Sequence, residues 1–255
     1  MELQGKTILI TGGSAGIGLE AAKQFIGAGL KVIITGRDQS KLDAAKKILP
    51  SIITIKSDIA RADDAVSLFN EVKRLGGIDI LYNNAGVLNF ASNFGVANDV
   101  HFKNASDEIY INYLGVIRLN NCFMEMLQSR REGAIINTTA ILSYSPSILE
   151  ATYSASKVAL RFYTETLRKH LQIMNSKVKV FELLPPVVAT EMTAERNGKK
   201  VSTETLVKAL ITGLEKDQYT IRVGDTKMLY IISRFFPKIA FGLVSPKEAY
   251  QSLKP

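Results

Sequence analysis

Short runs of apolar, β-branched residues alternate along this chain with stretches whose apolar residues recur at three- and four-residue spacing. The runs predict buried strands, and the spaced stretches predict helices that each pack one face against a sheet. The predicted strands cover residues 7–11, 31–35, 51–55, 78–82, 134–138 and 178–184. The predicted helices cover residues 17–28, 40–48, 62–75, 105–130, 152–174 and 203–216, each to within a few positions.

This alternation of strands and helices predicts parallel strand pairs joined by helical crossovers. The expected fold class is therefore α/β, a doubly wound parallel sheet of the Rossmann type. Composition does not change abruptly anywhere, and no repeat is visible beyond the strand–helix alternation. We expect one dinucleotide-binding domain over residues 1–255, in which 226–255 form a C-terminal helical extension.

The segment 226–244 is apolar but contains Arg234, Pro237 and Lys238. These interruptions make it unsuitable for crossing a bilayer. We interpret it as a pair of docking helices. A subunit contact and a peripheral membrane contact are the alternatives.

Charge and composition narrow the function classes. The net charge is +8, from 32 Lys and Arg against 24 Asp and Glu, but the basic residues are scattered, which favours a solvated surface and no nucleic-acid partner. Cys122 is the only cysteine, and the first residues lack a secretion-signal pattern, so we expect a cytoplasmic protein. His101 and His170 are far apart in sequence and away from Cys122, so we expect no metal site.

A glycine-rich stretch, residues 11–18 with the sequence TGGSAGIG, follows the first predicted strand and precedes a helix. Glycine allows a sharp turn, a close approach of the backbone to a pyrophosphate, and tight packing of helix on strand. The first N–H groups of the helix then face the phosphates. The placement between strand and helix predicts a dinucleotide site.

Together with this stretch, Asn83-Asn84-Ala85-Gly86, Asn112 and the pair Tyr153 and Lys157 resemble the short-chain dehydrogenase/reductase family. The resemblance extends to about residue 192. Within the family, stretches 13–20, 181–192 and 215–234 are similar to bacterial oxidoreductases encoded near teichoic-acid D-alanylation genes.

The resemblance implies which residues contact the cofactor. Asp58 and Ile59 correspond to the family's adenine-contacting pair, with helix capping as the alternative for Asp58. Thr190 corresponds to the threonine that holds the nicotinamide carboxamide, and Pro186 replaces the usual glycine nearby. The full set of implied cofactor contacts is Gly12, Ser14, Gly16, Ile17, Gly18, Arg37, Asp58, Ile59, Asn84, Ala85, Gly86, Tyr153, Lys157, Val188 and Thr190.

The end of the second predicted strand bears on the choice between NAD(H) and NADP(H). An acidic residue here would bind the ribose hydroxyls and repel a 2′-phosphate. The resemblance places Gly36 at that position, and the guanidinium of Arg37 suits a phosphate. We therefore favour NADP(H) over NAD(H). A solvated Arg37, or an Asp38 that reaches the ribose, is the alternative.

Tyr153 and Lys157 are four residues apart and so share one face of a helix. An ammonium near a phenol lowers the pKa of the phenol, which makes tyrosine a usable acid or base. The resemblance assigns catalysis to Tyr153, Lys157 and Asn112. It further implies that Lys157 binds the nicotinamide ribose and that Asn112 holds a water that relays protons.

One position departs from the family. The serine that bonds the substrate oxygen stands thirteen residues before the tyrosine, where this chain has Ala140, while Thr139 and Ser143 are hydroxyls out of register. Losing one such donor costs roughly 3–4 kcal/mol of transition-state stabilisation. The leading hypothesis is an NADP(H)-dependent oxidoreductase with a small-molecule carbonyl or alcohol substrate. The rival hypothesis is a non-catalytic dinucleotide-binding sensor or scaffold.

The substrate pocket is expected between segments 87–104, 142–151 and 187–202. Family analogy implies a homo-oligomer, with the predicted helices 105–130 and 152–174 as the interface.

Overall fold

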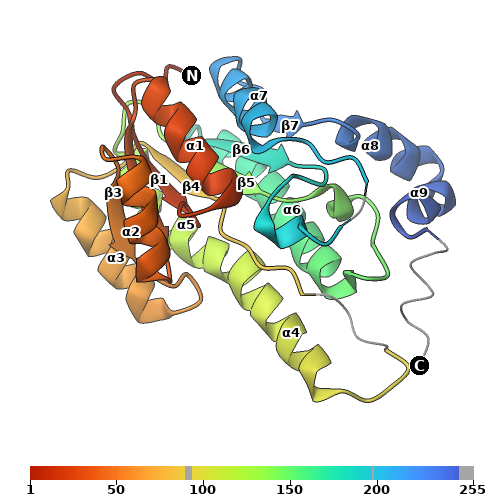
Figure 1. The fold of residues 1–255 in the computed structure, drawn as a ribbon. Coiled ribbons are helices and arrows are strands. Elements are labelled where there is room, and N and C mark those ends of the chain that lie inside the picture. The colour runs from red at the N-terminus through yellow and green to blue at the C-terminus, as the bar shows by residue number, and fades with distance from the viewer. Residues whose placement is uncertain (90–93, 197, 247–255) are drawn as a thin grey trace.

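Seven parallel strands form the centre of the computed structural model, which describes residues 1–89, 94–196 and 198–246 (Figure 1). The strands lie in the order β3-β2-β1-β4-β5-β6-β7. Their bounds are Thr7–Thr11 for β1, Lys31–Gly36 for β2, Ile53–Lys56 for β3, Ile80–Asn83 for β4, Ala134–Thr138 for β5, Lys179–Leu184 for β6 and Thr220–Arg222 for β7. The six predicted strands are confirmed. The edge strand β7 was not predicted.

Helices cover both faces of the sheet, as the doubly wound fold requires (Figure 1). One face carries α1, Gly16–Gly27, α2, Gln39–Ile48, and α7, Thr203–Glu215. The other face carries α3, Ala62–Arg74, α5, Gly115–Gln128, and α6, Ala151–Ile173. The expected α/β fold is confirmed.

Each face of the sheet has its own apolar core, because buried parallel strands alternate their side chains between the two helical layers. Ile8 and Ile10 of β1 pack toward Phe25 of α1, whereas Leu9 packs toward the layer that contains Phe123 of α5. All five of these side chains are fully buried. This double burial explains why the strand sequences are continuously apolar.

The predicted helix 105–130 begins earlier and is not continuous. It consists of α4, Asp99–Ile109, a π-helical turn, Tyr110–Leu114, and then α5. Asn98 caps α4, because its side chain accepts a hydrogen bond from the N–H of Val100 at 2.8 Å. π turns inside helices are frequent at functional sites, and this one contains Asn112.

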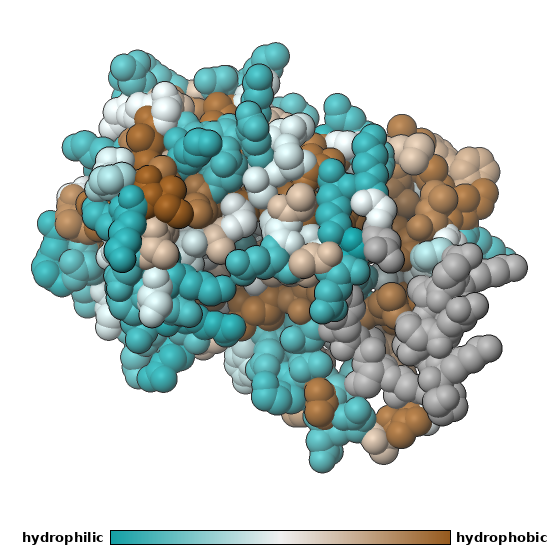
Figure 2. All heavy atoms as spheres, in the orientation of Figure 1, coloured by the Kyte–Doolittle hydropathy of each residue, from teal (hydrophilic) through white to brown (hydrophobic). Residues whose placement is uncertain are grey.

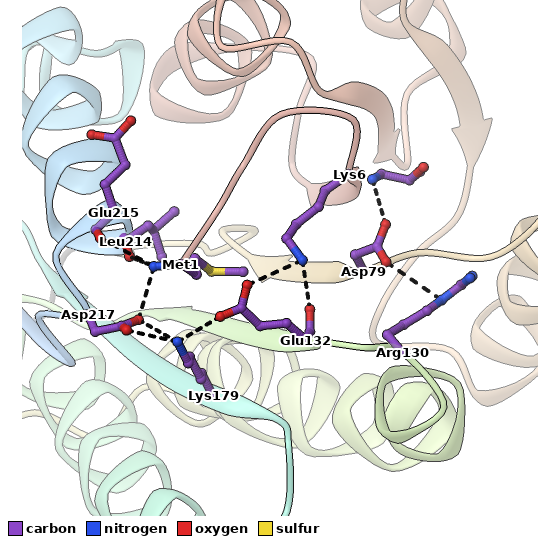
Figure 3. A network of polar contacts seen from close by, with 10 residues as sticks. Met1, Lys6, Asp79, Arg130, Glu132, Lys179, Leu214, Glu215 and Asp217 are labelled. Carbon is purple, nitrogen blue, oxygen red and sulfur yellow. Dashed lines mark hydrogen bonds and ion pairs between the residues drawn. The ribbon is translucent and has the colours of Figure 1, made fainter.

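A polar network joins the amino ends of the strands, at the edge opposite the glycine-rich turn (Figure 3). Lys179 at the start of β6 pairs with Glu132 at 2.7 Å and with Asp217 at 2.8 Å. The N-terminal ammonium of Met1 donates to Leu214 O at 2.8 Å. These contacts connect the chain start, β6 and the end of α7.

Two short helices follow β7, namely α8, Thr226–Phe235, and α9, Pro237–Val244. The predicted helix pair is therefore confirmed, and the remainder of the expected extension, 247–255, lies outside the described residues. Among the described residues, no helix has the length and apolar character needed to cross a membrane.

Candidate active site

A cleft of about 410 Å³ opens at the carboxyl ends of the strands, where the chain leaves β1 and β4. These strands are neighbours, and successive helices leave them toward opposite faces, so this is the switch point of the sheet, where doubly wound folds bind ligands. Eleven of the predicted cofactor contacts line the cleft: Gly12, Ser14, Gly16, Ile17, Arg37, Asp58, Ile59, Asn84, Ala85, Gly86 and Thr190.

The glycines of the glycine-rich turn allow the sharp turn and the tight packing of helix on strand that the sequence predicted. Gly12 has φ +63°, and a Cβ on it would lie 2.9 Å from Ala85 Cα. Gly18 does not line the cleft. A Cβ there would lie 2.2 Å from Gly12 O, so Gly18 permits α1 to pack tightly against the turn. The turn can therefore present backbone N–H groups to the cleft.

Thr11 and Asn84 hold the two sides of the switch point together. The hydroxyl of Thr11 accepts hydrogen bonds from the N–H groups of Asn84 and Ala85, both at 3.0 Å. The side-chain amide of Asn84 donates in return to Thr11 O at 3.1 Å and to Gly12 O at 3.2 Å. Asn84 thus fixes the backbone of the glycine-rich turn.

The family resemblance places an NAD-selecting acidic residue at position 36, which is Gly36 in this chain. A Cβ on Gly36 would lie 3.4 Å from Ser14 Oγ, in ordinary contact, so glycine at this position adds no carboxylate, although Asp38 also lines the cleft. Asp38 is the N-cap of α2, and its carboxylate accepts a hydrogen bond from Lys41 N at 3.1 Å. Arg37 and Lys41 also line the cleft. Lys41 was missed from the sequence, although its place in the first turn after β2 was visible.

Asp58, Thr190 and Val188 differ in their surroundings. Asp58 accepts a hydrogen bond from Ala60 N at 3.0 Å, and the N-cap of α3 is Arg61, so Asp58 stabilises a turn and does not cap that helix. Thr190 lines the cleft opposite Gly16. Val188 is buried in a bridge with Val201 and does not line the cleft.

Lys157 and Asn112 lie beside Gly86, with Tyr153 next to Lys157, although none of these three residues lines the cleft itself. Lys157 Nζ donates to Thr138 O at 2.9 Å and lies 5.7 Å from the centre of the Tyr153 ring. A Cβ on Gly86 would lie 3.5 Å from Lys157 Nζ and 3.1 Å from Asn112 Oδ1. Gly86 therefore connects the cleft to Lys157 and Asn112, two of the three predicted catalytic residues.

Asn112 is fully buried in the π-helical turn. Its amide group donates to Val87 O at 2.9 Å and to Ser156 Oγ at 3.0 Å, and its carbonyl oxygen accepts from Val87 N at 2.9 Å. These bonds tie the segment after β4 to the first turns of α6. The water relay implied by the family stays a prediction.

The pKa values at this site differ from the expectation. Burial lowers the pKa of Lys157 to about 8. The pKa of Tyr153 is raised, first by burial and then by the negative charge of Glu108. The expectation that Lys157 lowers the pKa of Tyr153 is therefore wrong for this structure, because the phenolate is desolvated and faces a carboxylate.

Ala140 is buried, and the two hydroxyls singled out from the sequence as out of register, those of Thr139 and Ser143, have other partners. Thr139 Oγ1 donates to Glu182 Oε1 at 2.8 Å, on the β6 side. Ser143 Oγ donates to Ala140 O at 2.7 Å. In this arrangement neither hydroxyl takes the place of the family serine.

Glu108 is a buried carboxyl group beside Tyr153 that the sequence reading did not single out. Its Oε1 accepts a hydrogen bond from Asn89 N at 2.7 Å, and the side chain of Thr152 also forms a hydrogen bond with the carboxyl group. Its Oε2 has no hydrogen-bond partner among the described residues. Burial raises the pKa of Glu108. The available signal was its position four residues before Asn112, on the same helical face.

The expected substrate segments meet at this end of the molecule, but residues 90–93 and 197 lie outside the described part. Glu150, just before α6, forms an ion pair with Arg196 of the segment that follows β6. The carboxylate of Glu150 is almost fully buried, so the pair fixes one segment on the other.

A glycine-rich turn at the switch point, with a tyrosine–lysine pair at the same sheet edge, defines the class of α/β oxidoreductases that bind a dinucleotide. The model of the short chain dehydrogenase family matches residues 6–201. The chain belongs to this family of oxidoreductases.

Individual relatives agree with this assignment. The chain is 32% identical over 235 residues to the uncharacterized oxidoreductase DltE of Bacillus subtilis, covering 87% of this chain and 89% of DltE. It is 33% identical over 196 residues to an NADPH-dependent 1-acyldihydroxyacetone phosphate reductase of Schizosaccharomyces pombe, covering 76% and 63%. A short chain dehydrogenase from Burkholderia cenocepacia, solved with NADP, matches all of both chains with TM-score 0.78 and 26% identity. The match to DltE confirms the resemblance to this kind of bacterial oxidoreductase that the sequence indicated.

Proposed function

We propose that this protein is an NADP(H)-dependent oxidoreductase that acts on a small-molecule carbonyl or alcohol. The observation that carries the proposal is the approach of Gly86, which lines the cleft, to Lys157 and Asn112. The cleft fits a dinucleotide, because its glycines leave room for a pyrophosphate at the N-terminus of α1. Cofactor and reacting group would thus meet at Tyr153.

The preference for NADP(H) is supported by the charges at the ribose end of the cleft. Arg37 and Lys41 line that end, and Gly36 supplies no carboxylate. The Asp38 side chain, which also lines the cleft, accepts from Lys41 N, and the ammonium of Lys41 pairs with Glu191 at 3.4 Å, which leaves Arg37 as the cation without a carboxylate partner among the described residues. Arg37 forms no ion pair with any described residue, so its guanidinium is available for a phosphate. The reductase of S. pombe is named for NADPH, and the B. cenocepacia structure contains NADP.

The chain's own residues would handle the proton. A bound nicotinamide dinucleotide supplies or accepts the hydride. Tyr153, whose raised pKa keeps its phenol protonated at neutral pH, would donate that proton to the substrate oxygen during carbonyl reduction. Lys157, with a pKa of about 8, would place a positive charge beside the oxygen that becomes anionic. Lys157 is buried and Tyr153 is partly buried, so water has limited access to this pair.

Calorimetric titration tests the cofactor assignment. We expect NADP(H) to bind more tightly than NAD(H), and Arg37→Ala to weaken NADP(H) binding about 10-fold or more, because a charge-assisted hydrogen bond contributes about 1.5–3 kcal/mol. Arg61→Ala, at an exposed arginine outside the cleft, is the matched control. Equal affinities for the two cofactors would contradict the assignment.

NADPH consumption over a panel of aldehydes and ketones tests the activity. We expect turnover with the native protein, and Tyr153→Phe to abolish turnover while binding NADPH as before. If the native protein binds NADPH but turns over no compound of the panel, this proposal is contradicted. The rival hypothesis of a non-catalytic dinucleotide-binding module, which is based on Ala140, then replaces it.

A further inference from the structure

The outer face of α8 and α9 carries a patch of large apolar side chains that nothing in the described structure covers. The patch consists of Met228, Ile231, Phe235, Phe236, Ile239 and Leu243, each between 55% and 70% exposed. Figure 2 shows apolar side chains gathered over these two helices. We call these six residues the apolar patch.

The inner face of the two helices is already attached to the body of the protein. Leu229 and Ala240 are buried. Tyr230 packs against Tyr144 with ring centres 5.1 Å apart, and Ser245 Oγ, just after α9, accepts from Ile148 N at 3.1 Å. Attachment to the segment between β5 and α6 therefore uses the opposite side of the helix pair, and the apolar patch stays uncovered by the described residues. The interpretation of 226–244 as docking helices accounts for one face only.

The charged side chains within α8 and α9 are all positive, and the only carboxylate beside these helices among the described residues of the segment is Asp225 at the N-cap of α8. Lys227, Arg234 and Lys238 are exposed in the same two helices, and none of them forms an ion pair with a described residue. The sequence contains no Asp or Glu from Thr226 to Pro246. A surface that combines apolar side chains with cations is complementary to an anionic lipid interface.

A second copy of the chain fits this face poorly. A two-fold dimer would place the patch against itself, so three cations would face three cations without any carboxylate from the same segment. Like charges at an interface oppose association, especially where the apolar contact excludes water. The same charges attract the negative headgroups of a membrane.

We propose that the outer face of α8 and α9 docks on the surface of an anionic lipid membrane, with the six apolar side chains inserted between headgroups. The protein would be a peripheral membrane protein through this face. Its cleft and its Tyr153 would stay in water, since they belong to the sheet edge and not to the patch. The docking is independent of the proposed enzymatic function.

Co-sedimentation of the full chain with vesicles tests the proposal. We expect binding to phosphatidylcholine vesicles that contain phosphatidylglycerol, at least 10-fold weaker binding to phosphatidylcholine alone, and weaker binding as salt is raised. Each charge near such a surface is worth about five-fold in affinity, so Lys227→Gln with Arg234→Gln should weaken binding about 25-fold. Ile231→Ser with Phe235→Ser should abolish it.

Lys47→Gln with Ile48→Ser is the matched control, because this exposed cation and apolar residue lie on α2. The control should sediment like the native protein, and all variants should keep native circular dichroism and NADPH affinity. Failure of the native protein to bind the anionic vesicles would overturn the proposal. An equal loss of vesicle binding in the control variant would also overturn it. So would a native protein that binds no vesicles and is a dimer, if Ile231→Ser with Phe235→Ser converts that dimer to monomers.

Discussion

At the scale of single residues, Ala140 stands where the family resemblance implies a serine. Thr139 and Ser143 direct their hydroxyls to Glu182 and to the carbonyl oxygen of Ala140. The substrate oxygen would therefore rely on Tyr153 without a second hydroxyl. Since one missing donor to a developing oxyanion is worth 10²–10³ in rate, the proposed enzyme is expected to be slow on simple carbonyls.

Ala140→Ser restores the missing hydroxyl and should raise kcat on a carbonyl substrate by up to about 10²-fold. Serine adopts the extended backbone of this position without strain. Initial rates of NADPH oxidation measure the effect. Ala155→Ser, an exposed position on α6, is the control and should leave the rate unchanged. An unchanged rate in Ala140→Ser would show that the oxyanion does not develop beside this residue.

At the scale of elements, the packing of α4 against α6 sets the environment of Tyr153, the proposed proton donor. Glu108 of α4 is held by Asn89 after β4 and by Thr152 in the first turn of α6, directly before Tyr153. Its negative charge adds to burial in raising the pKa of Tyr153. The two helices thus hold the phenol in its protonated form, which suits donation of a proton to a carbonyl.

Glu108→Gln removes this charge while its amide oxygen can still accept from Asn89. A phenolate without a neighbouring negative charge is more stable, so the pKa of Tyr153 should fall. The alkaline limb at which the protonated phenol is lost, which lies above the limb set by Lys157, should therefore move to lower pH. Tyrosinate absorbance, with Tyr153→Phe subtracted, measures the shift without any substrate.

Asp107→Asn is the matched control, because Asp107 is the adjacent carboxylate but pairs with Lys103 at the surface. It should leave the profile in place, since an exposed charge is screened by solvent. If Glu108→Gln lowers activity at every pH without moving the alkaline limb, its effect on folding, and not its charge, explains the loss.

At the scale of the whole molecule, the predicted oligomer interface remains a prediction. Within α6, Phe162 and Ile173 are 61% and 70% exposed, in the helix that family analogy assigns to the interface. Large apolar side chains on a helix face are expected to be covered by a partner. This surface belongs to a different helix from the apolar patch of α8 and α9.

Light scattering of the native protein should therefore give a mass of at least twice 28.0 kDa. Phe162→Glu should shift the mass toward the monomer, because it places a charge in a contact that excludes water. Ile48→Glu on α2, equally exposed, should not. A monomeric native protein would contradict the interface prediction and leave the vesicle experiment unaffected.

The sequence by itself determined the features that depend on local spacing. Continuous apolar runs identified six strands, because parallel strands are buried on both faces. The glycine-rich turn and the pair Tyr153 and Lys157 could be found from short motifs, since each occupies a single turn or a strand–helix junction. The family resemblance likewise identified Gly36, at the end of the second strand, as the position that lacks the acidic residue for binding the ribose hydroxyls.

Only the tertiary structure decided features that depend on residues distant in sequence. β7 has three residues and is a strand because it pairs with β6, at positions Glu182–Leu184. Glu108 becomes important because α4 packs on α6, and the hydroxyl of Thr139 is occupied because β5 adjoins β6. The face of α8 and α9 left exposed likewise depends on which side contacts the sheet layer. Periodicity shows that a helix has an apolar face, but burial is a property of what packs against it.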